Sequence, residues 1–107
     1  MLHLSETIQA NHKRFVSRVA ELEVVWGLKS PRGFAVCPSN DDKSQSVLIF
    51  WSDRGYASRV RQNHFPGYEA VEIPLFDFLF RWLPGMRNDG VLAGTNWNGD
   101  LAGVEIT

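Results

Sequence analysis

The run Val47–Trp51 restricts the fold more than any other part of the sequence. All of its residues are apolar, so the strand that it predicts is hydrophobic on both faces. Strands of this kind lie in the middle of a sheet, where neighbouring elements cover both faces. The run is also the longest uninterrupted apolar stretch in the chain, and it is far too short to span a bilayer. We therefore expect a central strand and no association with a membrane.

Helical and strand patterns alternate around this central strand. We expect helices over residues 6–22, from the caps Ser52 and Asp53 to His64, and from Pro74 to a stop at Pro84–Gly85. We expect strands over residues 24–26, 34–37, 47–51, 68–73, 91–97 and 104–106. The order α-β-β-β-α-β-α-β-β predicts an α+β fold in which a mixed, mostly antiparallel sheet packs against three helices.

The length of the chain indicates a single domain. Its 107 residues fit one α+β domain over residues 1–107. A folded chain of this size buries about two-thirds of the surface that its unfolded form exposes, which is enough for a core without disulfides. Cys37 is the one cysteine, so an internal disulfide is excluded. The first residues show no cationic stretch followed by an apolar run, and we expect a cytoplasmic protein.

The charge balance disfavours a nucleic-acid partner. Eleven Lys and Arg residues stand against twelve Asp and Glu residues, so the net charge is -1 with histidine neutral. Nucleic-acid-binding domains are usually basic. Tryptophans within predicted strands and helices are typical of cores rather than of stacking platforms. All four tryptophans occupy such positions: Trp26, Trp51, Trp82 and Trp97. We therefore expect no nucleic-acid partner.

No set of residues predicts catalysis or metal binding. Cys37 lies in a predicted strand, remote in sequence from His12 and His64, and a lone cysteine in such a strand is most often an inert core residue. The histidines have no metal-binding spacing, and the glycines form no phosphate-binding loop. Asp53 is better placed to cap the second helix than to leave its N-terminus free for an anion. We expect no catalytic residue, no metal and no cofactor, and we favour a non-enzymatic protein.

The third predicted helix has an unusually wide apolar face. At 100° per residue, one face of this helix collects Leu75, Leu79, Trp82, Leu83 and Met86. Phe76 and Phe80 flank this face, and the whole apolar arc covers roughly 200°, which is wider than packing on one sheet requires. Either another part of the chain covers the two phenylalanines, or they form an exposed patch for a protein partner or a second copy.

Strand ends offer a second candidate site. Trp51 ends the central strand, Asp53 and Arg54 follow it, and Asn96 and Trp97 end a later strand. Aromatic, amide and charged side chains at strand ends can line a small-molecule cleft. The alternative is turn and cap chemistry, for which Asn, Ser and Asp are common residues, and the sequence modestly favours this alternative.

The order and spacing of several landmarks resemble a known family. The landmarks are Val25–Leu28, Phe50–Arg54 with Ala57, Gly67–Glu69, Ile73, Phe78–Leu79, Trp82–Gly85, Asp89–Gly90 and Gly94–Trp97. Together they resemble the small bacterial family named domain of unknown function 2750, over nearly the whole chain. The resemblance implies a stand-alone α+β protein and brings no established activity, cofactor or catalytic residue. It also implies polar or acidic residues in the third helix, where this chain has Phe76 and Phe80.

Two classes of function follow from these patterns. The leading hypothesis is a non-enzymatic bacterial interaction module, of which an immunity-like protein is one version, that binds through Phe76 and Phe80. The alternative is a small-molecule-binding protein or minor enzyme with a cleft at Trp51 and Asn96.

Overall fold

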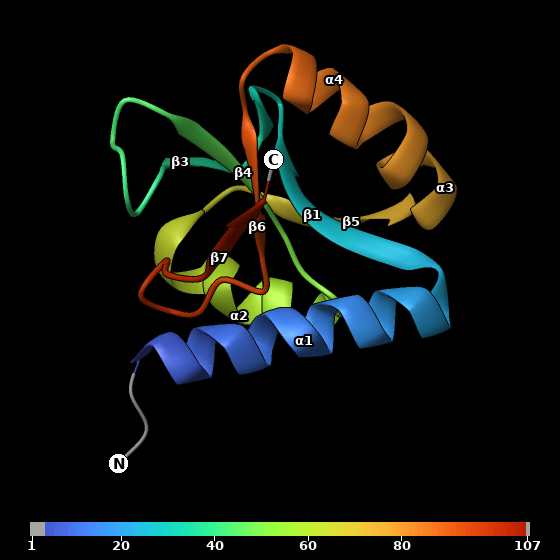
Figure 1. Cartoon of the computed structure of the whole chain (residues 1–107), viewed down its shortest axis with the longest axis horizontal. Coiled ribbons are helices and arrows are strands. Elements are labelled where there is room, and N and C mark those ends of the chain that lie inside the picture. The colour runs from blue at the N-terminus through green and yellow to red at the C-terminus, as the bar shows by residue number, and fades with distance from the viewer. Residues whose placement is uncertain (1–3, 107) are drawn as a thin grey trace.

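The computed structural model describes residues 4–106 of the chain (Figure 1). Its helical elements are α1 (Leu4–Leu22), α2 (Arg54–His64) and a third helical region made of α3 (Leu75–Asp77), η1 (Phe78–Trp82) and α4 (Leu83–Asn88). Its strands are β1 (Val24–Ser30), β2 (Gly33–Phe34), β3 (Val36–Pro38), β4 (Ser46–Phe50), β5 (Glu69–Pro74), β6 (Leu92–Thr95) and β7 (Val104–Ile106).

The strands pair into two sheets. One sheet has the order β2-β1-β5, and the other has the order β3-β4-β6-β7. All of these pairs are antiparallel except β4 with β6, which run parallel. The α+β class, the three helical regions and the mostly antiparallel pairing predicted from the sequence are confirmed. The strands divide between two sheets where the sequence predicted one.

Ala35 is the point at which the chain passes from one sheet to the other. Gly33–Phe34 pairs with β1, whereas Val36–Pro38 pairs with β4. Ala35 itself is buried, and its N–H donates to the carbonyl of Leu28 in β1 at 2.8 Å. A strand that bends at such a corner can serve two sheets. The strand predicted over residues 34–37 is therefore divided into β2 and β3.

A pair of tryptophans joins the two sheets. The backbone N–H of Trp26 in β1 donates to the carbonyl of Trp51 at 2.8 Å, and the N–H of Trp51 donates to the carbonyl of Trp26 at 2.7 Å. Trp51 directly follows β4 in the chain. This two-bond bridge fixes the position of one sheet relative to the other.

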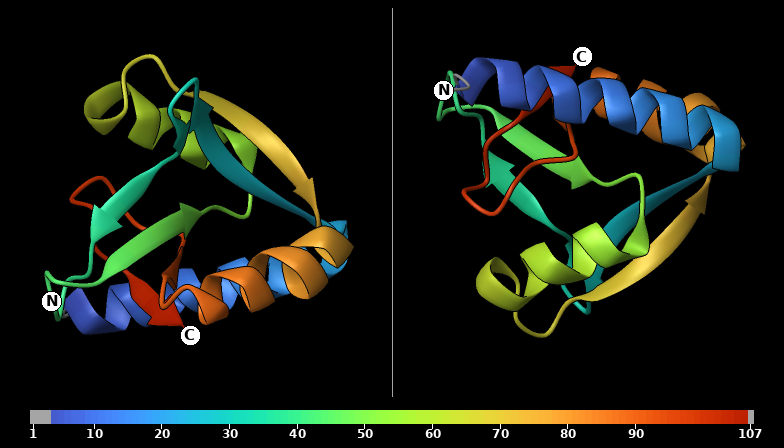
Figure 2. Two further views of the ribbon diagram at one scale, coloured as in Figure 1. Left: turned by 90° about the horizontal axis from the view of Figure 1, so that it is seen from above. Right: turned by 90° about the horizontal axis from the view of Figure 1, so that it is seen from below.

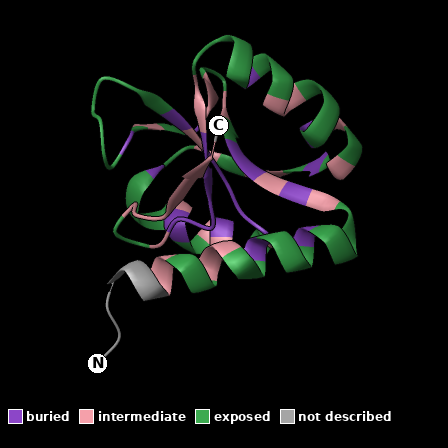
Figure 3. Cartoon of the chain, in the orientation of Figure 1, coloured by how far each residue is buried: buried purple, intermediate pink, exposed green. Residues whose placement is uncertain are grey.

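β4 lies between β3 and β6 and is buried on both faces, which confirms the predicted central strand. Val47, Ile49 and Trp51 pack with Ala57 and other residues of α2 in one core cluster. Phe50 faces the opposite way and packs with residues of α1, η1 and α4 in a second cluster. Figure 2 shows the same division, with α2 on one side of the strands and α1 and α4 on the other. Figure 3 shows that the buried residues concentrate along the strands and on the inward faces of the helices.

The third helix does not end at Pro84–Gly85, and this part of the sequence-based prediction is wrong. Its middle is the π-helical turn η1, in which the N–H of Leu83 donates to the carbonyl of Phe78. Proline in a regular α-helix lacks a donor, and its ring clashes with the carbonyl four residues earlier. The π turn shifts the hydrogen-bond register just before Pro84, so that Pro84 lies at the beginning of α4, where its missing N–H costs little.

α4 ends instead at the predicted turn over Asn88–Gly90. Gly90 has φ 72°, in the left-handed region that favours glycine. Its N–H donates to the carbonyl of Arg87 at 3.2 Å, and the N–H of Val91 donates to the carbonyl of Met86 at 2.8 Å. This pair of bonds is the Schellman motif, which satisfies the last carbonyls of a helix.

The position of the helix end predicts opposite effects for two glycine substitutions. Gly85→Ala should raise the free energy of unfolding by about 0.5–1 kcal/mol, because Gly85 is an exposed glycine inside the helix with no atom within 4 Å of an added Cβ. Gly90→Ala should lower it by about 1–2 kcal/mol, because alanine is strained at this φ. Urea unfolding of both variants measures the two changes. If Gly85→Ala destabilised as much as Gly90→Ala, the helix would end at Gly85.

Candidate functional site

The parallel pairing of β4 with β6 brings together residues of the predicted strand-end site. The C-terminal ends of parallel neighbours lie at the same edge of a sheet, so Trp51 and Ser52 meet Asn96 and Trp97. The indole N–H of Trp51 donates to the carbonyl of Trp97 at 3.0 Å. The backbone N–H of Ser52 donates to Oδ1 of Asn96 at 2.8 Å. We refer to Trp51, Ser52, Asn96 and Trp97 as the strand-end node.

Asn96 connects the node to both long helices. Its Nδ2 donates to the hydroxyl of Ser52 at 3.0 Å and to the carbonyl of Asn11 in α1 at 3.2 Å. The hydroxyl of Tyr56 in α2 donates to its carbonyl at 3.3 Å. Its φ of 48° is a left-handed conformation that asparagine adopts more readily than most residues. The side-chain amide therefore links the end of β6 to the end of β4 and to α1, and the backbone carbonyl of Asn96 links it to α2.

The strand-end node is part of the core. Trp51, Asn96 and Trp97 are each 0% exposed, as is Ser52. A ligand could contact them only by displacing packed side chains and breaking the hydrogen bonds described above. Their burial therefore disfavours the small-molecule cleft that the sequence suggested for these residues and favours the structural alternative.

The remaining two residues of the predicted cleft lie outside the node. Oδ1 of Asp53 accepts a hydrogen bond from the N–H of Tyr56 at 2.8 Å, so Asp53 caps α2 as predicted. Arg54 is exposed, and its guanidinium lies 5.9 Å from the centre of the Trp26 ring. It lines a surface hollow between α2 and β5, and no residue of the strand-end node lines this hollow.

Trp97 occupies a slot between two glycines. A Cβ built on Gly94 would lie 2.5 Å from Nε1 of Trp97, and a Cβ built on Gly103 would lie 2.3 Å from Cδ1 of the same ring. The ring is also held by its N–H, which donates to the carbonyl of Val104 at 3.1 Å. Because neither the ring nor the backbone has room to move, both positions require glycine.

Phe76 and Phe80 form an exposed pair on the third helical region. They are 64% and 65% exposed, and their ring centres lie 4.9 Å apart. The described part of the chain therefore leaves most of both rings uncovered. Leu79, on the same helix, is 43% exposed, and Val16 on α1 is 53% exposed. We refer to Val16, Phe76, Leu79 and Phe80 as the apolar patch.

A groove runs between α1 and the third helical region, lined by Leu75 and Leu79, which directly precede Phe76 and Phe80 in the chain. Phe15 and Phe78 meet edge to face with ring centres 6.4 Å apart and form its floor. Val16 and Leu79 line it from α1 and η1, and its volume is about 260 Å³. All of its lining residues are apolar except His12.

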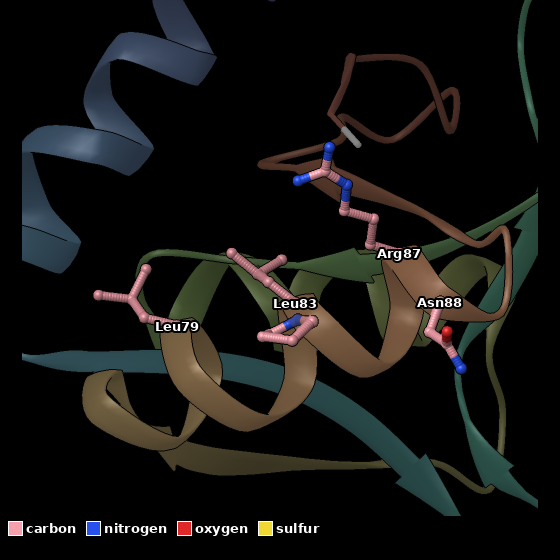
Figure 4. A pocket seen from close by; sticks show the side chains of 5 residues that line it. Leu79, Leu83, Arg87 and Asn88 are labelled. Carbon is pink, nitrogen blue, oxygen red and sulfur yellow. The ribbon is translucent and has the colours of Figure 1, made fainter.

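A second hollow continues this groove along the third helical region. It has a volume of about 640 Å³, and it shares Leu79 and Leu83 with the groove. Figure 4 shows that Leu79, Leu83 and Arg87 project from the same side of the helix. The apolar surface therefore extends over about two helical turns and ends at a cation.

The described thiol and imidazole groups do not converge. Nδ1 of His12 lies 2.7 Å from the hydroxyl oxygen of Thr95, and Nε2 of His64 contacts the carbonyl of Gly99. In the described part of the chain, no three His, Cys, Asp or Glu side chains are arranged to hold a metal ion. His3 lies outside the described residues. No helix among the described residues is long and apolar enough to cross a membrane.

The arrangement defines a small α+β protein with a buried strand-end node and an exposed apolar patch. The chain belongs to the family described as protein of unknown function (DUF2750), whose model matches residues 12–107. The match covers nearly the whole chain and confirms the resemblance read from the sequence landmarks. No curated protein and no solved structure matches this chain.

Sequence reasoning missed two surface features. The groove between α1 and η1 depends on packing between elements that are distant in the sequence, so no local sequence pattern predicts it. The hollow beside Arg54 had a signal, because Arg54, Ser58 and Arg61 recur at the spacing that places residues on one helical face.

The glycine slot predicts a large loss of stability for a small substitution. Gly94→Ala should lower the free energy of unfolding by about 2–3 kcal/mol, because the added methyl overpacks against a ring that cannot move. Gly99→Ala is the matched control, since no atom lies within 4 Å of its added Cβ. Urea unfolding followed by tryptophan fluorescence compares the two. Equal stability of both variants would show that Trp97 is not tightly enclosed.

The environment of Cys37 predicts an unreactive thiol. Burial raises the pKa of this thiol, so less thiolate is present at any pH near neutrality than for a free cysteine. Alkylation by iodoacetamide at pH 7.5 should be about tenfold slower in the folded protein than in the urea-unfolded chain. Mass spectrometry of timed samples measures both rates. Faster alkylation of the folded protein would indicate an activated nucleophile.

Proposed function

We propose that this protein is a non-enzymatic interaction module that binds an amphipathic helix of a partner protein on the apolar patch and the adjoining groove. The observation that carries the proposal is the exposure of Phe76 and Phe80, which are two-thirds uncovered although the same helix buries Phe78. Full burial of a phenylalanine side chain contributes about 1.5–3 kcal/mol. A partner that covers both rings therefore gains binding free energy that the folded chain leaves unused.

The size of the patch favours a helix over a second copy of the chain. A large aromatic side chain offers ~150–250 Å² of surface, so the partly exposed residues of the apolar patch present on the order of 400–500 Å². A stable interface between folded proteins buries about 800 Å² on each partner. A single helix with two or three apolar anchors needs less area, and a groove between two helices suits it.

Two cations, one next to the apolar patch on α1 and one at the hollow that continues the groove, indicate the chemistry of the polar face of the partner helix. Lys13 is exposed on α1, three residues before Val16 and therefore next to it on the helix surface. Arg87 borders the hollow beside Leu83 (Figure 4). Among the described residues, neither cation has a carboxylate oxygen within 4.0 Å. Acidic side chains on the polar face of the partner would meet both cations.

The proposal includes the cellular location of the protein and one special case of its role. A bacterial cytoplasmic location is consistent with a single cysteine, which can form no internal disulfide. An immunity-like role is the special case in which the bound helix belongs to a toxic protein, and it stays a prediction.

The double variant Phe76→Asp with Phe80→Asp should lose partner binding while its melting temperature stays within a few degrees, because exposed side chains contribute little to stability. The matched control is Val36→Asp, which places the same charge on an exposed apolar residue of β3. Affinity capture from the source cells, with the wild-type protein, the double variant and the control variant each used as bait, identifies the partner. A synthetic peptide of the partner's helix is then titrated by calorimetry, with at least a tenfold loss of affinity expected for the double variant.

Three results would contradict the proposal. Retention of the same partner by the double variant would place the interface elsewhere. A large fall in its melting temperature would show that both rings belong to the core. A stable wild-type dimer in size-exclusion chromatography with light scattering, abolished in the double variant, would show that a second copy occupies the patch.

A further inference from the structure

α2 is a basic helix whose two sides are used differently. It contains Arg54, Arg59 and Arg61 and no acidic residue. On one side, Arg59 and Arg14 of α1 lie over the Tyr56 ring, each with its guanidinium carbon 5.4 Å from the ring centre. Burial raises the pKa of the Tyr56 hydroxyl, and the electron-rich faces of the ring attract both cations. These two arginines are thereby engaged within the protein.

The other side of α2 borders a polar hollow. Its volume is about 410 Å³, and it lies between α2 and the beginning of β5. It is lined by Arg54, Ser58, Arg61, Tyr68, Glu69 and Ala70. The three residues from α2 recur at i, i+4 and i+7, so they extend along the side of the helix rather than around its N-terminus. The helix N-terminus itself is closed by its Asp53 cap.

The two guanidinium groups at this hollow lack a counter-ion. Among the described residues, no carboxylate oxygen lies within 4.0 Å of either Arg54 or Arg61, although Glu69 lines the same hollow. Arg54 is instead held over the Trp26 ring, at 5.9 Å from its centre. Stacking of this kind fixes a guanidinium while leaving its N–H groups free for another acceptor.

The donors at the hollow match one ligand chemistry. Guanidinium groups bind phosphate oxygens through pairs of parallel hydrogen bonds, and the hydroxyls of Ser58 and Tyr68 can donate to the remaining oxygens. Glu69 is an acceptor in the same hollow, so it suits a hydroxyl or amino group on the ligand. The volume lies within the range of small-molecule sites.

We propose that this hollow binds a small phosphomonoester that carries a hydroxyl or amino group near its phosphate. Arg54 and Arg61 hold the phosphate, Ser58 and Tyr68 complete its hydrogen bonds, and Glu69 accepts from the neighbouring hydroxyl or amino group. The site is separate from the apolar patch, because α2 covers the opposite side of the strands from the third helical region (Figure 2). The phosphate-site proposal is therefore tested independently of the proposed interaction module.

Ribose 5-phosphate and inorganic phosphate are the probes, and each is titrated into the ¹⁵N-labelled protein. A titration with sodium chloride at the same ionic strength is the control. Saturable shifts of the arginine Nε–H signals of Arg54 and Arg61 are expected with both probes and not with chloride. Arg61→Gln and Arg54→Gln should each weaken ribose 5-phosphate binding at least tenfold. The matched control Arg59→Gln, on the other side of α2, should leave it unchanged, and unaltered amide spectra elsewhere check that each variant is folded.

Substitution of Glu69 distinguishes recognition of the phosphate from recognition of the neighbouring hydroxyl or amino group. Glu69→Gln should strengthen binding of inorganic phosphate two- to threefold, because a nearby negative charge is removed, and should reduce the preference for ribose 5-phosphate. Linear, unsaturated shifts with both probes, or equal weakening by Arg59→Gln and Arg61→Gln, would overturn the proposal. Tighter binding of acetate or citrate than of either phosphate would also overturn it, because the site would then select carboxylates.

Discussion

The side-chain amide of Asn96 is the interaction on which the rest of the structure depends. It joins the ends of β4 and β6 through Ser52 and reaches the backbone of α1 at Asn11. An amide at 0% exposure is stable only if its donors and acceptor are satisfied, and here each has a partner. Because these partners come from segments far apart in the chain, the amide specifies one arrangement of the elements. The adjacent Trp51 extends this arrangement to the other sheet through its bridge to Trp26.

This filled node explains why the surfaces, and not the strand ends, are available for binding. In many folds the carboxyl ends of parallel strands border a crevice, and here the Trp51 and Trp97 side chains occupy that space. The rigid layer that they stabilise holds α2 on one side and α1 with the third helical region on the other (Figure 2). Each side then carries its own exposed chemistry: a cationic, hydroxyl-lined hollow beside α2, and an apolar patch beside α1. Rigid support of this kind lets exposed side chains bind without first being ordered.

Local patterns predicted the elements well where one local cause dominates. The apolar run Val47–Trp51 predicted a central strand, and Asp53 caps α2 as its residue type indicates. The prediction failed at Pro84–Gly85, because a π turn earlier in the helix removes the conflict that normally ends a helix at proline. The corner at Ala35 was also missed, because the division of one strand between two sheets depends on which partners lie beside it.

The sequence by itself determined the three helical regions, most of the strands and their order, the family, and the unusual placement of Phe76 and Phe80 beside an already apolar helical face. Periodicity and turn chemistry are properties of neighbouring residues, so they can be read directly from the chain. Only the tertiary structure decided which candidate side chains are accessible. Burial depends on contacts between distant segments, such as Asn96 with Asn11, and the same residues that looked like a cleft became core. The sheets cover only one side of the third helical region. Phe78 is therefore buried in the core, while Phe76 and Phe80 remain exposed.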